Sequence, residues 1–405
     1  CKSLSSIGGF DPLTFSLILK RLKSIPWLPG LFSLLAGLAY AVQGVYYAHG
    51  LDVTMDEGTY LMKGLLYVRG AYAPFEPYGP LTNKSPLAFF ILGLPQALFE
   101  PGLRTGRYFG VFLGLVILAG TWLAARRLGG RWWAAGATWA LASNPAGVVF
   151  YTLAASQAPA AALIVWALAL TLGKERRGWE LVLGSALAAL APMARQNLIP
   201  LTGLVWLYLI WEHGWRRGLP AALAGAGVLV AFNAFYWPAI LDTIWRPLLP
   251  GFFRWILPPS TVSSGGGVSN WTQNYDDLSR LYVFWEGLRF HFAAMFGALA
   301  VWIFWPGRKG WRNESRMKAA VMLSTTLLVL TAEHYYAAAG MNYCLFCYSG
   351  YLAFFSPAGL MLVAAVGPSL ARRGGWMRQA LAMLLTIAGS AGIGFGAYQE
   401  LHKAL

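Results

Sequence analysis

"WLPGLFSLLAGLAYAVQGVYYAHGLDVTMDEGTYLMKGLLYVRG", residues 27–70, joins a long apolar run to an adjacent pair of acids. Residues 27–48 carry no charged side chain and are long enough to cross a bilayer as a helix. Of the 405 residues, 57% are hydrophobic and only 12% are charged, whereas a soluble chain carries about a quarter charged residues. The sequence therefore predicts an all-α polytopic membrane protein.

Eleven more apolar runs follow the first one. They lie near 86–101, 105–125, 132–151, 153–172, 179–193, 196–212, 219–241, 287–305, 319–338, 345–366 and 377–398. The run at 86–101 is the shortest of the three before residue 126 and contains Pro95, which favours an interfacial or re-entrant helix over a crossing. The remaining runs predict about 11 transmembrane helices, with interfacial helices in the first loop.

Positive charge is gathered in short clusters between these runs. Lys and Arg number 31 against 16 Asp and Glu, a net charge of +15. The clusters are Lys20–Lys23, Arg126–Arg131, Lys174–Arg177, Arg216–Arg217, Arg308–Lys318 and Arg372–Arg378. From residue 126 onward, two apolar runs separate each neighbouring pair, so all clusters can share the cytoplasmic side. No basic-aromatic nucleic-acid module is present, and the charge is explained by topology.

This topology divides the chain into four parts. Residues 1–26 form a cytoplasmic amino-terminal arm, and 27–241 form a transmembrane module whose first external loop is 49–104. Residues 242–286, with the turn-rich "PPSTVSSGGGVSNWTQNYDD", form a second external loop. Residues 287–405 form the carboxy-terminal transmembrane helices.

Asp56 and Glu57 lie in the first external loop, just before "TYLMKGLLYVRGAY", which has helical spacing of its apolar residues. One interpretation is a helix amino terminus, where acids favour the helix dipole. The other is a functional carboxylate at the membrane boundary, which takes a proton from a hydroxyl or holds a divalent metal. Two adjacent acids in a chain with only 16 Asp and Glu favour the second.

The segments that follow strengthen the functional interpretation through their order. "DEGTY" is followed by "RGAY" at 69–72, "NKSPL" at 83–87 and "GLRTGRYFG" at 102–110. This ordered set, over about residues 27–210, resembles the GT-C membrane glycosyltransferases. The branch it resembles is family 39-like and contains protein O-mannosyltransferases and lipid A aminoarabinose transferases. The resemblance implies a GT-C-like fold.

The resemblance also implies roles for residues of the first loop. Asp56 would be the catalytic carboxylate with Glu57 as its partner, and Lys84 would contact the phosphate of a polyprenyl-phosphate sugar donor. The alternative for Lys84 is a lysine that snorkels to the interface. Arg107 is expected to be structural, pairing with a helix end or an acid.

Three later residues are further candidates for binding the donor phosphate. Arg195, in "ALAPMARQNLIPL", lies at a depth where charge suggests function or a buried partner. Arg254, in "DTIWRPLLPGFFRW", either clamps phosphate or anchors the chain at the interface. His334, in "TAEHYYAAAG", either orients phosphate or acceptor or is a packed, hydrogen-bonded histidine.

One position departs from the family pattern. Related enzymes commonly carry a second acid in the next external turn, where this chain has Ser156 and Gln157. That departure leaves open a donor specificity outside the best-known members, or a scaffold that has lost catalysis and serves as a noncatalytic subunit of a larger membrane complex. A lipid or solute transporter is a further alternative, because it would also explain the many helices and the basic surfaces. The missing acid also weakens the case for a metal. A divalent metal is left open as the one candidate cofactor, with Asp56 as its candidate ligand.

The favoured hypothesis is an integral enzyme of the bacterial plasma membrane with its active face non-cytoplasmic. It would transfer a sugar from a polyprenyl phosphate to a hydroxyl of a protein, lipid or polysaccharide acceptor. Its other expected partners are membrane lipids, while the identities of the sugar and the acceptor are left open.

Overall fold

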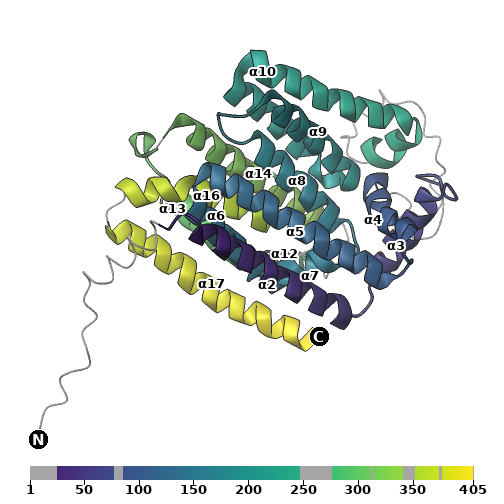
Figure 1. Ribbon diagram of the computed structural model, residues 1–405, viewed down its shortest axis with the longest axis horizontal. Coiled ribbons are helices and arrows are strands. Elements are labelled where there is room, and N and C mark those ends of the chain that lie inside the picture. Colours follow the sequence, from purple (N-terminus) through teal and green to yellow (C-terminus); the bar gives the residue numbers. More distant parts are fainter. Residues whose placement is uncertain are drawn as a thin grey trace, which may run out of the picture.

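The structure is a computed structural model, and it describes residues 25–76, 85–246, 276–311, 313–340, 352–373 and 376–404. Every regular element in these ranges is helical (Figure 1), so the all-α prediction is confirmed. The elements are α2 (Leu28–Gly50), α3 (Met55–Val68), α4 (Pro86–Leu98), α5 (Leu103–Leu128), α6 (Arg131–Ala142), α7 (Pro145–Thr152), α8 (Gln157–Thr171), α9 (Gly178–Ala194), η1 (Gln196–Leu198), α10 (Ile199–Phe235), η2 (Leu241–Trp245), α12 (Asp277–Arg289), α13 (Phe292–Ile303), η5 (Arg308–Gly310), α14 (Glu314–Gly340), α16 (Phe355–Arg373) and α17 (Trp376–Ala404).

Helix α5 lies at the centre of the bundle and packs against α2, α6, α8 and α16. Its inner face buries Ile117 completely, and Gly114 lies where a Cβ atom would overlap the Tyr40 hydroxyl of α2. Helix α8 is buried on almost every side and is rich in alanine. Small residues let membrane helices approach closely, so van der Waals packing holds these four neighbours to α5.

The predicted apolar run at 132–151 is divided in the structure. Helix α6 ends at Ala142, and Asn144 caps α7, with its side-chain oxygen accepting a hydrogen bond from the Gly147 amide. A turn at residues 153–156 then bends the chain by 110° between α7 and α8. This turn is irregular backbone that is buried in protein, the setting in which membrane proteins tolerate it.

The single element α10 is a helical hairpin. Gly214 has φ 70° and ψ 178°, a backbone conformation that interrupts the helix. A Cβ atom on Gly218 would lie 2.1 Å from the Leu209 carbonyl oxygen, so the two halves fold back on each other. The two apolar runs predicted at 196–212 and 219–241, with Arg216 and Arg217 between them, are therefore confirmed as separate helices.

Contacts gather the positive clusters at one end of the bundle, which we call the basic end. Arg127 of α5 pairs with Glu180 of α9, and Lys318 of α14 lies 3.7 Å from Glu212 of α10. Arg131 donates to the Pro26 carbonyl (3.1 Å), and Arg378 donates to that of Trp305 (3.1 Å). These contacts agree with the prediction that the clusters from residue 126 onward share one side, which stays a prediction. The cluster Lys20–Lys23 lies outside the described residues.

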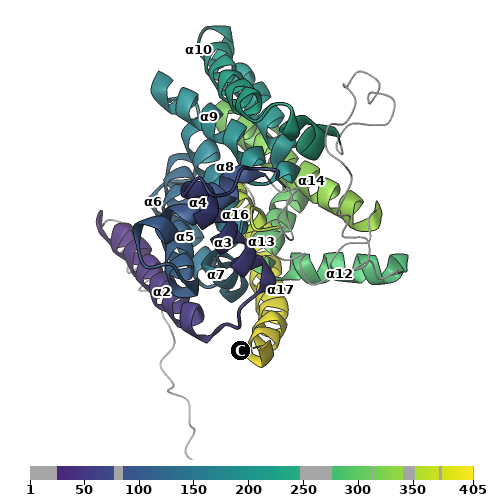
Figure 2. The ribbon, with the colours of Figure 1, turned by 90° about the vertical axis from the view of Figure 1, so that its right-hand side faces the viewer.

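The opposite end, which we call the loop end, carries α3 and α4 (Figure 1, right). Figure 2 views the molecule from this side, with α3 and α4 in front of the long helices and α12 projecting sideways from the bundle. Helix α4 has 13 residues, so it is about 20 Å long, shorter than the roughly 30 Å hydrocarbon layer. Its length agrees with the prediction that run 86–101 does not cross.

Length and composition identify three described helices that could each cross a membrane: α2, α5 and the segment Gln196–Phe235. The bent pair of α7 and α8 would make a fourth if it counts as one span, and five shorter apolar helices accompany them. The hairpin in α10 adds another crossing to this set. The total of eleven spans stays a prediction.

Candidate active site at the start of helix α3

Helix α3 begins with a reciprocal capping arrangement. Thr54 is the N-cap, and its hydroxyl accepts a hydrogen bond from the Glu57 amide at 3.3 Å. The Glu57 carboxylate returns the contact by accepting from the Thr54 amide at 3.1 Å. This pattern satisfies two amide groups that a helix start otherwise leaves without partners. It fixes the first turn, which contains both Asp56 and Glu57.

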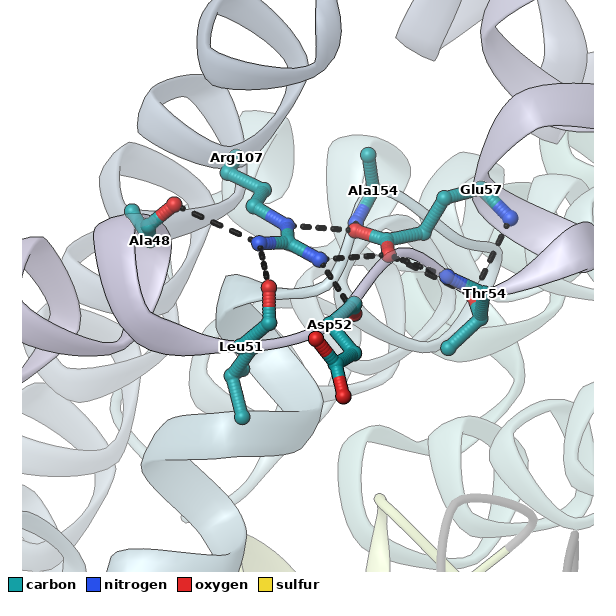
Figure 3. A network of polar contacts seen from close by, with 7 residues as sticks. All are labelled: Ala48, Leu51, Asp52, Thr54, Glu57, Arg107 and Ala154. Atoms are coloured by element: carbon teal, nitrogen blue, oxygen red, sulfur yellow. Dashed lines mark hydrogen bonds and ion pairs between the residues drawn. The ribbon is translucent and has the colours of Figure 1, made fainter. Parts of the chain in front are cut away.

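Glu57 forms a buried ion pair with Arg107 of α5 (Figure 3). The Arg107 Nε and Nη2 atoms donate to the two Glu57 carboxylate oxygens at 2.9 and 2.8 Å. Neither side chain is more than 1% exposed. Two parallel hydrogen bonds give this pair a fixed geometry. The expectation that Arg107 pairs with an acid is confirmed.

Arg107 also binds the end of α2. Its Nη1 donates to the carbonyl oxygens of Leu51 (2.7 Å) and Ala48 (3.3 Å), and its Nη2 donates to that of Asp52 (2.8 Å). All five guanidinium N–H groups therefore have an acceptor. The positive charge lies where the α2 dipole is negative. Arg107 thus holds the chain at the point where it leaves α2 and enters α3.

The second anchor of Glu57 comes from the turn between α7 and α8. The Ala154 amide donates to the Glu57 carboxylate at 3.0 Å. Burial works against ionisation of Glu57, but the hydrogen bonds from Arg107, Ala154 and Thr54 and the charge of Arg107 outweigh it and lower its pKa. Glu57 is therefore an ionised carboxylate whose two oxygens are already occupied. This geometry favours a positioning role for Glu57 over direct contact with a substrate.

The same turn contacts the predicted site residue Arg195, and the adjoining η1 contacts His334. The Arg195 guanidinium donates to the Ser156 hydroxyl at 2.8 Å, and the Asn197 amide nitrogen lies 2.9 Å from His334 Nε2. His334 Nδ1 lies 2.7 Å from the Leu330 carbonyl oxygen, so a neutral ring can donate there and accept from Asn197. The set Glu57, Ala154, Ser156, Arg195, Asn197 and His334, called here the polar chain, runs across the loop end from α3 to α14.

The predicted site residues thus divide into three groups. Glu57, Arg195 and His334 belong to the polar chain. Asp56 lies one residue before Glu57, half-buried, with no hydrogen bond or ion pair to the described part of the protein. Lys84 and Arg254 lie outside the described residues. The described ranges contain no group of three or more His, Cys, Asp or Glu side chains that could hold a metal ion, so Asp56 as a metal ligand stays a prediction.

Sequence reasoning did not single out Lys63, which is almost completely buried on α3 (2% exposed). Its ammonium group lies 5.6 Å from the centre of the Tyr72 ring and 5.9 Å from that of Phe89. Burial lowers the pKa of Lys63 to about 8. The lysine thereby links α3, α4 and the loop after α3 through cation–π contacts. Only its place among aromatic residues in the sequence could have indicated this environment.

Helices α3 and α4 meet through glycine. A Cβ atom on Gly93 would lie 2.1 Å from the Gly64 carbonyl oxygen, and one on Gly64 would lie 2.4 Å from the Phe89 carbonyl oxygen. The two backbones are therefore in direct contact. The amino-terminal end of α4 is also held from behind, because the Ser85 hydroxyl donates to the Pro192 carbonyl of α9 at 3.1 Å. This contact fixes the residue next to the predicted phosphate ligand Lys84.

Comparison with known proteins gives one family match and two structures of similar fold. Residues 83–239 match the family model "dolichyl-phosphate-mannose-protein mannosyltransferase". The fold is similar to that of ArnT from Cupriavidus metallidurans, both bound to undecaprenyl phosphate and in the apo state. Sequence identity is 19% and 18%, the TM-scores are 0.53 and 0.52, and 90% and 93% of this chain are covered. No curated protein matches.

The chain is therefore an integral membrane protein with a GT-C fold, as predicted. Within that class, its fold resembles that of ArnT, and it spans 64% of the length of the ArnT chain. The family match contains Arg107, Ser156 and Arg195 but begins after the acidic pair. The hydrogen bonds from Arg107 and Ala154 to Glu57 connect the matched segment to α3.

Proposed function

We propose that the protein is a membrane glycosyltransferase that uses a polyprenyl-phosphate-linked sugar donor and transfers the sugar to an acceptor hydroxyl. The observation that carries this proposal is the geometry at Asp56. A half-buried carboxylate, with no hydrogen bond or ion pair to the described residues, follows a rigid cap and precedes the anchored Glu57. The family match and the crystal structure of ArnT with undecaprenyl phosphate support a lipid-linked donor.

In the proposed reaction, the Asp56 carboxylate accepts the proton of the acceptor hydroxyl. The hydroxyl oxygen forms a bond to the anomeric carbon of the sugar while the bond from that carbon to the phosphate oxygen breaks. The electron pair of the broken bond leaves with the polyprenyl phosphate, and the anomeric configuration inverts. Lys84, Arg195 and Arg254 would stabilise the negative charge that develops on the leaving phosphate.

We further propose that the loop end faces away from the cytoplasm in a bacterial plasma membrane. The basic clusters gathered at the opposite end support this orientation through the positive-inside rule. The acceptor then meets the donor at the non-cytoplasmic surface. The acceptor is a hydroxyl of a protein, a lipid or a polysaccharide.

A second candidate is a noncatalytic GT-C-like subunit of a larger membrane complex. The observation in its favour is Gln157, which stands where related enzymes carry an acid. Purification from native membranes distinguishes the two, because an obligate subunit would be recovered only with its complex. An enzyme would be recovered with donor lipid.

The deciding experiment is a transfer assay on the purified protein with the lipid that native mass spectrometry finds bound to it. Asp56→Asn keeps the shape of the side chain but cannot accept the proton, so turnover is expected to fall by about 10²–10⁴ with an unchanged melting temperature. Asp52→Asn is the matched control, because Asp52 is an exposed acid of the same loop. Full turnover by Asp56→Asn would remove Asp56 from the mechanism.

A further inference from the structure

Three buried oxygen atoms near the polar chain lack a hydrogen-bond donor within the described ranges. They are Gln157 Oε1, Gln196 Oε1 and Glu333 Oε2. Buried polar atoms in proteins are nearly always paired, so an unpaired one indicates a missing water, ion or ligand. A carboxylate buried in a membrane protein is costly and is commonly functional. These three atoms therefore require a partner from outside the described residues.

All three residues are neighbours of the polar chain in sequence. Gln157 follows Ser156, Gln196 separates Arg195 from Asn197, and Glu333 precedes His334. The contacts Arg195–Ser156 (2.8 Å) and Asn197–His334 (2.9 Å) bring these neighbours together from α8, η1 and α14. The three residues thus lie on segments that these contacts join at the loop end.

Glu333 lies on the interior side of α14. It follows Thr326 by seven positions and Leu330 by three, and both of those side chains are fully buried. Residues with this spacing share one face of a helix. The Glu333 carboxylate therefore faces the bundle rather than lipid.

The chemistry of the three atoms defines what can bind. A carboxylate and two amide oxygens are hydrogen-bond acceptors, so they suit a neutral group with several O–H donors. A phosphate offers acceptors and negative charge and does not match. A divalent cation favours several carboxylates, and no cluster of three metal-ligating side chains exists among the described residues.

We propose that Glu333, together with Gln157 and Gln196, binds the hydroxyl groups of the sugar carried by the donor. This inference rests on the proposed function and adds the residues that recognise the sugar rather than the phosphate. Glu333 would supply, from α14, the acidic group that position 157 lacks. The site would orient the sugar so that its anomeric carbon faces the acceptor.

The test compares two lipids, undecaprenyl phosphate and undecaprenyl phosphate linked to mannose, in binding to protein in nanodiscs. The wild type is expected to bind the mannose-linked lipid more tightly. Glu333→Gln should weaken binding of that lipid by about ten- to a hundredfold and leave binding of the bare lipid unchanged, because one charge-assisted contact to the sugar is lost. Gln196→Ala should weaken the same preference.

Glu314→Gln is the matched control, since Glu314 lies on the same helix at the basic end and its side chain is 72% exposed. It should retain the full preference for the mannose-linked lipid. The inference is overturned if Glu333→Gln and Gln196→Ala keep the preference, if the wild type binds both lipids equally, or if EDTA abolishes the preference and so indicates a metal site. A wild type that binds neither lipid would contradict the proposed function itself.

Discussion

The partners of the Glu57 carboxylate decide what that residue does. Its oxygens accept hydrogen bonds from the side chain of Arg107 and from the amides of Thr54 and Ala154. Asp56, one position earlier, has none of these contacts. Two adjacent acids of similar chemistry therefore divide into an anchored group and an available one, and the division follows from the direction of each side chain on the first turn of α3.

Glu57→Gln should destabilise the protein by about 3–5 kcal/mol at pH 7, because it leaves the buried Arg107 charge without its counterion. The pKa of Glu57 is lowered in the folded state. Its stabilising effect is therefore fully present above the unfolded pKa of about 4.3 and is lost as the pH falls through the folded value. The difference in stability between wild type and variant should narrow below about pH 4.

Unfolding in detergent, followed at several pH values, measures this difference. Glu100→Gln serves as the control, since Glu100 is an exposed acid of the same loop region, and it should leave stability unchanged at every pH. A Glu57→Gln protein as stable as the wild type at pH 7 would show that the ion pair does not hold the loop.

The pairing of α3 with α4 depends on contact between two glycines. Gly93→Ala would place a Cβ atom 2.1 Å from the Gly64 carbonyl oxygen, a distance that no rotamer change relieves. The helices must separate, and overpacking of this kind costs about 1–3 kcal/mol. A lowered melting temperature and faster proteolysis of the segment between residues 70 and 85 are the expected results.

Gly58→Ala is the matched control on α3. A Cβ atom at that position meets nothing within 4 Å, so alanine should be neutral or should stabilise the helix by up to about 1 kcal/mol. Equal melting temperatures for the two variants would contradict the close contact between α3 and α4.

At the level of elements, the sequence predicted the helix positions that depend on the local pattern of residues. The apolar runs gave the positions of α2, α5, α8 and both halves of α10, and the acidic pair gave the start of α3. The sequence also predicted that Arg107 would pair with a helix end or an acid, and it binds both. The eleven spans, the phosphate ligands and the catalytic role of Asp56 stay predictions.

Contacts between distant elements could not be predicted. The hydrogen bond from the Ala154 amide to Glu57 joins residues 97 positions apart. The hydrogen bond from Arg195 to Ser156 joins residues 39 positions apart. Hydrophobic periodicity says which face of a helix is buried but not which neighbour covers it. Lys63 was missed for the same reason, because its aromatic neighbours Tyr72 and Phe89 come from two separate segments.

Across the whole molecule, the two sets of polar contacts occupy opposite ends. Arg107 and Arg127 stand 20 positions apart on α5, which corresponds to about 30 Å along a helix. On α14, Lys318 lies at the basic end and His334 at the loop end, about 24 Å apart along the helix. This spacing matches the thickness of the hydrocarbon layer. The contacts therefore mark the two surfaces between which the bundle would lie in a membrane.

This arrangement predicts the accessibility of engineered cysteines in intact cells, introduced after replacement of the three native cysteines. A cysteine at Thr59 on α3 should react with a membrane-impermeant maleimide added from outside, because the loop end is proposed to face away from the cytoplasm. A cysteine at Arg131, which is exposed at the basic end, should react only after the cells are opened. The reverse pattern would invert the topology and exclude an outward-facing active site.

The Glu57–Arg107 pair has a consequence for reading mutational scans of this protein. Five of the groups that hydrogen-bond to it belong to the backbone: the carbonyls of Ala48, Leu51 and Asp52 and the amides of Thr54 and Ala154. Every residue type supplies the carbonyl, and every type except proline supplies the amide. A scan that replaces side chains will therefore register Glu57 and Arg107 as two isolated sensitive positions 50 residues apart, while most of the groups that bind them stay invisible to it.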